Sequence, residues 1–440
     1  MLGDFLGLDY EVEVFNEKFI EITQPESIAS QDKLTLDATF FIQADRGWLT
    51  SDTMPSLPLS SWCPREDCID ANLVEPIIPV LYGRSGLDCS LGNLHLNLDI
   101  FGSCFFMLSR YEELVSSVRD SHNRFPARAA VAFKENFLDR PLVNEYVEIL
   151  WNCLIKISPE LRRKKRVFKK RISCDVDHPL DTAGYSLRRT VLRVFARIIR
   201  DRKPKIAALD VLNYVFKKFG SDHFDEYRNN ISWIMSVNKQ AGNEVAFYFI
   251  PLQTDLSMED PSDVRSDKVL SLIRHIVDSG HEVGIHPGYK TYNHPVNFQR
   301  SCIAFKQALH NADIDFKKIG GRQHYLRYDI STTPQLWEKN GFHYDSSLGF
   351  ADRAGFRCGV CYEYKMYDLL NRAKMKLIQR PLVLMETTLL AYENLNLNDG
   401  TLLNRISYFE KVIRSYKGDF TLLWHNSSLP NNEIYKSSIG

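Results

Sequence analysis

The spacing of apolar residues between positions 170 and 425 changes repeatedly from that of a buried strand to that of a helix. Runs of apolar, mostly β-branched or aromatic residues predict strands at 171–176, 245–250, 282–286, 318–325, 342–345, 377–386 and 420–425. Amphipathic spacing predicts helices at 186–200, 225–240, 263–279, 298–312, 333–339 and 401–416. Strands that alternate with helices of this length indicate parallel βα units. We therefore expect residues 166–440 to form an α/β domain, a distorted (β/α) barrel whose closure leaves no unpaired strand edges.

The first 165 residues have a different pattern. Short β-type runs, such as 39–42 and 77–82, are separated by Pro, Ser and Gly, and helices are predicted only at 99–113 and 141–151. This pattern predicts a small α+β N-terminal domain over residues 1–165. Its charged residues at 110, 112 and 113 are expected to form a structural ion cluster, because no nucleophile or ligand set stands near them.

Length and charge narrow the class of protein. A chain of 440 residues exceeds the size of a single hydrophobic core, so two domains are expected. Lysine plus arginine equals aspartate plus glutamate, at 55 each, so the charge of the whole chain indicates neither a nucleic-acid binder nor an acidic partner. No apolar run approaches the roughly 20 residues that cross a bilayer, and the first residues lack the pattern of a secretory signal. Together with nine scattered cysteines, expected to be reduced, this predicts a cytoplasmic protein.

Two basic segments stand out from this balanced composition. The run at 162–171 is expected to be a solvated linker rather than a nucleic-acid site. The helix at 186–200 carries an apolar stripe with arginines away from it. It fits a peripheral contact with an anionic membrane surface, and it equally fits a helix packed on the outside of a barrel.

Two acids one residue apart end the strand at 171–176. Period-two alternation places Asp175 and Asp177 on the same face. Like charges at close range repel unless a cation or a shared proton relieves them, so the pair indicates a metal site. The alternative is a turn in which Asp177 caps the segment before Pro179.

Further polar residues follow the other predicted strands. In a barrel of parallel strands, the carboxyl ends share the face on which active sites are built. The residues at or just after these ends are Asp175, Asp177, His286, Arg322, Asp345 and His425. Their convergence predicts an active site, although Asp345 in Tyr-Asp-Ser-Ser also reads as a cap.

Five motifs in order carry a resemblance to a known family. They are Asp-x-Asp, Glu-Val-Gly-Ile-His, Arg-x-x-Tyr, Gly-Phe-x-Tyr-Asp-Ser-Ser and Leu-Leu-Trp-His. Over residues 170–430 the chain resembles the NodB-type polysaccharide deacetylases of carbohydrate esterase family four. It looks closest to a branch with an appended N-terminal domain, associated with surface-polysaccharide synthesis such as lipopolysaccharide or capsule.

The resemblance implies catalytic roles for four residues. Asp175 matches the family's general base, and Arg322 the arginine that orients this carboxylate. Tyr325 matches the residue whose backbone N–H helps to hold the oxyanion. His425 matches the histidine that protonates the leaving amine.

The resemblance also implies a divalent metal, Zn²⁺ or else Co²⁺, Ni²⁺ or Mn²⁺, bound by Asp177 and His286. The family's second metal histidine stands four residues after the first, where this chain has Lys290. We expect His294 as the third ligand. The open alternatives are His178, His324, or a weak or missing metal with Lys290 supplying the positive charge.

The implied activity is a metal-dependent hydrolase that removes an N-acetyl group from a sugar in a glycan or glycan precursor. Its partner would be that N-acetylated sugar, with no nucleic acid. The alternative is a catalytically silent glycan-binding or scaffold protein that kept the deacetylase fold.

Overall fold

The computed structural model describes residues 1–15, 18–23, 33–90, 93–200, 202–261, 263–396, 400–427 and 432–440. It divides into two compact units. Unit 1 comprises Met1–Lys169, Leu348–Leu384 and Arg405–Phe420, and unit 2 comprises Lys170–Ser347, Met385–Asn404 and Thr421–Gly440. The chain first passes from unit 1 to unit 2 after Lys169. The expected boundary after residue 165 stays a prediction. Two later segments, expected in the second domain, belong to unit 1.

Unit 1 contains a five-stranded sheet in the order β1-β2-β3-β7-β6. Its pairs are antiparallel except for β3 with β7, which is parallel. The strands are β1 Glu11–Phe15, β2 Phe19–Thr23, β3 Leu34–Asp37, β6 Gly83–Ser90 and β7 Asn93–Leu98. Two antiparallel pairs complete the unit, β4 Ser60–Trp62 with β5 Ile78–Val80 and β13 Tyr364–Asp368 with β14 Ala373–Gln379.

The helices of unit 1 correct two sequence-based expectations. They are α1 Thr39–Arg46, α2 Ile100–Leu108, α3 Tyr111–Val115, α4 Val131–Lys134 and α5 Leu142–Ile157. The expectation of a β-type run at 39–42 is wrong, because these residues begin helix α1. The buried Asp99 carboxylate accepts hydrogen bonds from the N–H groups of Phe40 and Gly102, at 2.8 and 2.7 Å, and so stabilises the first turns of both α1 and α2. The single helix expected at 99–113 is broken at Arg110, whose φ of 55° is left-handed.

Unit 2 is built on a sheet in the order β12-β11-β10-β9-β8-β16-β15. The pairs from β8 to β12 are parallel. The strands are β8 Lys169–Val176, β9 Val245–Phe249, β10 Glu282–Ile285, β11 Gly320–Gly321, β12 Tyr344–Asp345, β15 Leu384–Met385 and β16 Asp419–Leu423. All five residues of β9 are buried, as expected for a strand covered on both faces. The predicted α/β class is confirmed, and closure into a barrel stays a prediction.

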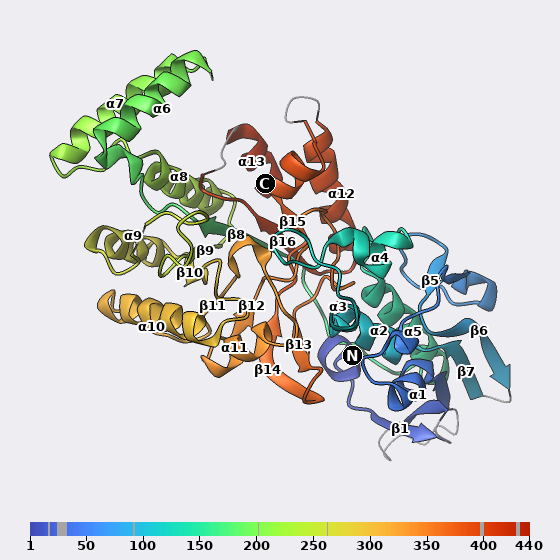
Figure 1. Ribbon diagram of the computed structural model, residues 1–440. Helices are drawn as coiled ribbons and strands as arrows, with labels where there is room; N and C mark the ends of the chain where they lie inside the picture. Colours follow the sequence, from blue (N-terminus) through green and yellow to red (C-terminus); the bar gives the residue numbers. More distant parts are fainter. Residues whose placement is uncertain are drawn as a thin grey trace. The chain divides into compact units, whose positions relative to one another are not determined.

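The helices of unit 2 are α6 Leu187–Ile199, α7 Pro204–Lys218, α8 Glu226–Gln240, α9 Asp267–Asp278, α10 Pro295–Asn311, α11 Thr333–Lys339 and α13 Asn432–Ile439. Helix α12, Thr401–Ser415, begins in unit 2 and continues into unit 1. Helices α8, α9 and α10 lie in a row beside strands β8 to β11, whereas α6 and α7 extend away from the strands as a hairpin (Figure 1). The sequence reading missed α7. Across the described residues, no helix combines the length and hydropathy needed to span a membrane.

Candidate active site

The parallel register of unit 2 brings strand ends together. Ile285 pairs with Gly321, so His286 and Arg322 follow at the same edge of the sheet. A Cβ atom on Gly321 would collide with the carbonyl oxygen of Ile285, so the close approach of β10 and β11 requires glycine at this position. Asp175, the next-to-last residue of β8, pairs with Tyr248 on β9. The polar residues expected at one face therefore start from adjacent strands.

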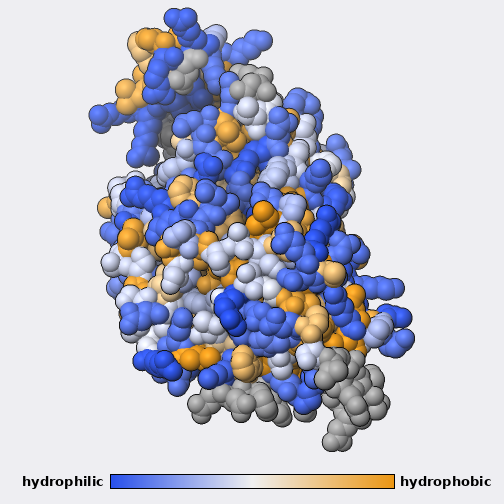
Figure 2. Space-filling view, turned by 90° about the vertical axis from the view of Figure 1, so that its right-hand side faces the viewer, coloured by the Kyte–Doolittle hydropathy of each residue, from blue (hydrophilic) through white to orange (hydrophobic). Residues whose placement is uncertain are grey.

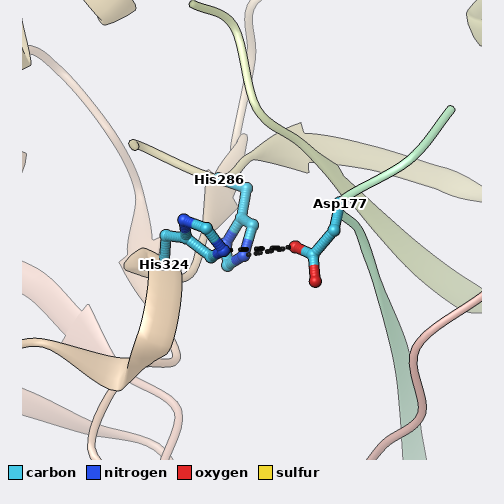
Figure 3. Close-up of side chains that lie close together, drawn as sticks. All are labelled: Asp177, His286 and His324. Atoms are coloured by element: carbon cyan, nitrogen blue, oxygen red, sulfur yellow. Dashed lines mark ion pairs between the residues drawn. The ribbon is translucent and has the colours of Figure 1, made fainter. Parts of the chain in front are cut away.

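Three of these side chains converge as a candidate metal centre. Asp177, His286 and His324 each present a ligand atom, and the three atoms lie within 4.8 Å of one another. Oδ1 of Asp177 lies 3.4 Å from Nε2 of His286 and 3.6 Å from Nε2 of His324. Figure 3 shows the two imidazoles next to each other, both facing the carboxylate of Asp177. One carboxylate and two imidazoles are a donor set that divalent zinc commonly takes.

The hydrogen-bond partners of both imidazoles occupy their Nδ1 atoms and leave the Nε2 atoms facing this centre. Nδ1 of His286 lies 2.6 Å from the carbonyl oxygen of Arg322, which can only accept, so Nδ1 carries the proton. Nδ1 of His324 lies 3.1 Å from a carboxylate oxygen of Glu259. Metal-binding histidines are typically fixed through their second nitrogen in this way.

Two buried polar atoms at the centre are left unsatisfied. Within the described residues, neither Oδ1 of Asp177 nor Nε2 of His286 has a hydrogen-bond partner. Burying a polar atom without a partner costs about 1–3 kcal/mol, more if it is charged. A bound cation would satisfy both atoms, so the residues present fit a divalent metal.

The charge of Asp177 suits a ligand. Burial raises its pKa, but the nearby imidazole of His286 and the charges of His324 and His425 more than offset this, so the pKa lies well below its usual value. Asp177 is therefore held as a carboxylate.

Glu259 is a site residue that sequence reasoning missed. Besides His324, its fully buried carboxylate accepts hydrogen bonds from the backbone N–H groups of Thr254, Asp255 and Tyr289. Burial raises its pKa, but the contacts with His324 and the backbone lower it overall. Glu259 lies 65 positions before His324 in a loop after β9, so no motif or spacing in the sequence links the two.

A second buried pair adjoins the centre. Nη1 of Arg322 donates to Oδ1 of Asp175 at 2.7 Å and to Oγ of Ser173 at 3.0 Å, and the rest of the guanidinium donates to Ser346. The other oxygen of Asp175, Oδ2, lies 3.7 Å from Nε2 of His286. Asp175 is thus fixed on one oxygen and faces the metal centre with the other.

A third group joins the site from the end of β16. Nδ1 of His425 lies 2.6 Å from Oε1 of the fully buried Glu386, and its Nε2 lies 3.9 Å from Oδ2 of Asp177. Burial lowers the pKa of His425, but the carboxylates of Glu386 and Asp177 more than offset this and raise it to about 10. His425 is therefore an imidazolium with Nε2 directed toward the site, and Glu386 is the group that orients it.

Other sequence-based candidates lie outside the metal centre. The ring of His294 accepts from the N–H of Asn297 at 3.3 Å and caps α10. Nδ1 of His178 pairs with Asp260 at 2.8 Å, and Nζ of the exposed Lys290 pairs with Asp255 at 2.9 Å.

Two remaining candidates follow β11 and β12. Tyr325 lies in the short turn after Arg322 with a left-handed φ of 62°, and its side chain is partly exposed. Asp345 is buried and accepts from the N–H of Ser347 at 3.1 Å, as a turn cap does.

Comparisons with known proteins give limited further information. A family model described as a family of unknown function, DUF7033, matches residues 1–159. No curated protein matches the chain.

Several solved structures resemble this chain at low identity. One is described as a polysaccharide deacetylase from Mycobacterium smegmatis, with 14% identity, coverage of 63% of this chain and 84% of that chain, and a TM-score of 0.40. Puue allantoinase has 12% identity, coverage of 53% and 68%, and a TM-score of 0.34. A protein described as a polysaccharide deacetylase involved in O-antigen biosynthesis, from Bordetella bronchiseptica, has 11% identity, coverage of 45% and 65%, and a TM-score of 0.26. All three TM-scores lie below 0.5, so we take these likenesses no further.

Proposed function

We propose that this protein is a metal-dependent hydrolase that removes an N-acetyl group from a sugar in a glycan or glycan precursor of cytoplasmic surface-polysaccharide synthesis. The observation that carries the proposal is the cluster of Asp177, His286 and His324, with two buried ligand atoms unsatisfied. The sugar and the acetyl group come from the motif resemblance. The roles of Asp175 as base and His425 as acid come from the same resemblance, and the positions of their side chains beside the metal-ligand cluster support them.

The proposed metal ligands are one carboxylate and two imidazoles. Asp177, His286 and His324 would hold a divalent ion, with Zn²⁺ the best match to this donor set and Co²⁺, Ni²⁺ or Mn²⁺ as substitutes. When bound, the ion polarises the amide carbonyl and lowers the pKa of a bound water. In this proposal His324 takes the place that we expected for His294.

Asp175 is the proposed general base. Its Oδ1 is held by Arg322, and its Oδ2 is directed toward the centre, where it can take the proton of the attacking water. The buried guanidinium fixes the carboxylate in one orientation, so Asp175 does not have to be ordered at each turnover. The backbone N–H of Tyr325 remains a proposed oxyanion contact.

His425 is the proposed general acid. As an imidazolium oriented by Glu386, it can donate the proton on Nε2 to the amine nitrogen when the carbon–nitrogen bond breaks. The products are acetate and a free amino sugar. The base Asp175 would thus take the proton that leaves the water, and the acid His425 would supply the proton that reaches the amine.

Release of acetate tests the proposal. The protein is incubated with Zn²⁺ or Co²⁺ and a panel of N-acetylated sugar nucleotides, lipid-linked sugars and oligosaccharides. We expect acetate from at least one substrate, and a loss of about 10²- to 10⁴-fold in the rate for Asp175→Asn and for His425→Ala. His294→Ala is the matched control and should retain activity.

The opposite result would favour the silent alternative. Purified protein that binds an N-acetylated glycan but takes up no divalent metal and releases no acetate from the panel would contradict a hydrolase.

A further inference from the structure

Helix α6 presents an apolar face to the solvent. Its side chains at 187, 191, 192, 195, 198 and 199 recur at spacings of one, three and four residues, which places them on one stripe of the helix. Between 51% and 65% of each is exposed: Leu187, Val191, Leu192, Phe195, Ile198 and Ile199.

Helix α7 continues this surface. Exposed apolar side chains occur along it and directly after its end, with Phe219 exposed to 84%: Leu209, Val211, Leu212, Val215, Phe216 and Phe219. In Figure 1 α7 runs beside α6, and Figure 2 shows hydrophobic next to hydrophilic side chains on the hairpin at its top. Soluble proteins rarely expose so many neighbouring apolar side chains unless they bind something.

The inward faces of the same two helices are polar. The buried residues are Thr190 on α6 and Ala207, Asp210, Asn213 and Lys217 on α7. Asp210, Asn213 and Lys217 belong to a network of ion pairs and hydrogen bonds at the base of the hairpin.

Two anchors of this network show how the hairpin is held. Arg193 bonds Asp181 at 2.7 Å and Asp210 at 2.9 Å, and Lys217 bonds Asp225 at 2.6 Å. The hairpin is therefore held to unit 2 by ion pairs and turns its apolar side outward, the reverse of an ordinary surface helix pair.

The charge of the hairpin indicates what covers the apolar face. From Ser186 to Gly220 the sequence has ten Lys and Arg but only two Asp, whereas the whole chain is neutral. Exposed cations border the apolar face near both ends of the helices: Arg188, Arg189, Lys203, Lys205 and Lys218. A second copy would bring the same excess of positive charge, and nucleic acid would leave the apolar side chains in water.

We propose that the α6–α7 hairpin attaches the protein to the surface of an anionic lipid bilayer. The apolar face of both helices enters the boundary between head groups and acyl chains, and the bordering Lys and Arg contact anionic head groups. This attachment is interfacial and stands apart from the proposed deacetylase activity. Since Asp181 at the base of the hairpin follows Asp177 by only four positions, the candidate active site would stay close to the membrane.

Flotation of the full-length protein with lipid vesicles tests this inference. Vesicles of phosphatidylcholine alone are compared with vesicles that also contain phosphatidylglycerol, at low and at high salt. We expect binding to the anionic vesicles, weaker binding at high salt, and little binding to phosphatidylcholine alone.

Two variants separate the apolar and the charged contributions. The triple variant Phe195→Ser, Ile199→Ser and Phe219→Ser should bind at least about tenfold more weakly, because it removes apolar area that would be buried in the bilayer. The double variant Lys203→Glu and Lys205→Glu should also lose about tenfold or more on anionic vesicles. Leu256→Ser, at a side chain 88% exposed outside the hairpin, is the matched control and should bind like the unchanged protein.

Three results would overturn the inference. One is the absence of binding to anionic vesicles by a protein whose circular dichroism spectrum shows that it is folded. A second is unchanged vesicle binding by the triple serine variant, because binding would then be electrostatic without insertion. The third is a dimer that the triple variant disrupts, without vesicle binding, which would assign the face to a second copy or another protein.

Discussion

Each unit contains a cluster of largely buried ionisable residues, and the two clusters differ in whether their polar atoms have hydrogen-bond partners. In unit 1, Arg110 and Arg357 both bond the carboxylate of Glu113, at 2.6 to 2.9 Å, and Glu112 bonds Arg110 at 2.6 Å and the N–H of Val131 at 2.8 Å. Each carboxylate oxygen of this ion cluster has a partner. In unit 2, the metal centre leaves Oδ1 of Asp177 and Nε2 of His286 without one.

This difference in hydrogen bonding distinguishes a cluster that stabilises the fold from one that can bind a ligand. Burial raises the pKa of Glu113, but Arg357 and Arg110 lower it to about 2, so its charge is balanced within the protein. At the candidate metal centre, a carboxylate oxygen and two imidazole nitrogens lie within 4.8 Å of one another. Burial and charge alone therefore do not identify a site. Unsatisfied atoms that converge on one point do.

Removal of a charge from the ion cluster should have the largest effect on folding. Glu113→Ala leaves two buried guanidinium groups without their shared carboxylate, so we expect the free energy of unfolding of unit 1 to fall by about 3–5 kcal/mol. Chemical denaturation followed by circular dichroism measures the change. Glu66→Ala, at an exposed acid of the same unit, is the control. Equal stability of the two variants would show that the ion cluster is not structural.

Metal addition should stabilise unit 2 and identify the third ligand. At a free Zn²⁺ concentration of one hundred times Kd, the unchanged protein should gain about 2.7 kcal/mol, seen as a higher Tm. Asp177→Asn and His324→Ala should show no such gain. His294→Ala should respond like the unchanged protein, and the reverse pattern for the two histidine variants would restore the original expectation of His294.

The smallest effect is expected from a change to Glu259, which bonds the proposed metal ligand His324. Glu259→Gln keeps the shape but weakens the orientation of His324, so metal affinity should fall by about 10- to 100-fold. Titration calorimetry measures this affinity. Asp255→Asn, which weakens the ion pair with exposed Lys290 but keeps an oxygen for the two hydrogen bonds from Ser257, should leave the affinity within about twofold, since an ion pair with an exposed lysine contributes little. Equal affinities for the two variants would contradict a supporting role for Glu259.

Local spacing along the chain was sufficient to predict most elements of unit 2. The helix expected at 225–240 is α8, with Asp225 as its cap, and the strand expected at 245–250 is β9. These patterns depend on neighbours one to four positions apart, so the sequence contains them directly. Distant contacts decided the cases in which prediction failed. Asp99, about sixty positions away, starts helix α1 where a strand was expected.

The chemistry of the strand ends was likewise visible in the sequence, but its partners were not. Period-two alternation alone placed Asp175 and Asp177 together, and the order of strands suggested His286 beside them. Which third imidazole reaches Asp177 depends on the pairing of β10 with β11, which brings His324 to His286, whereas His294 is held at the start of α10. Glu259 and Glu386 act through contacts 65 and 39 positions away. The sequence by itself therefore determined the elements and the types of residue at their ends, and only the tertiary structure decided which side chains meet, because sheet order and loop paths bring together residues that no local spacing connects.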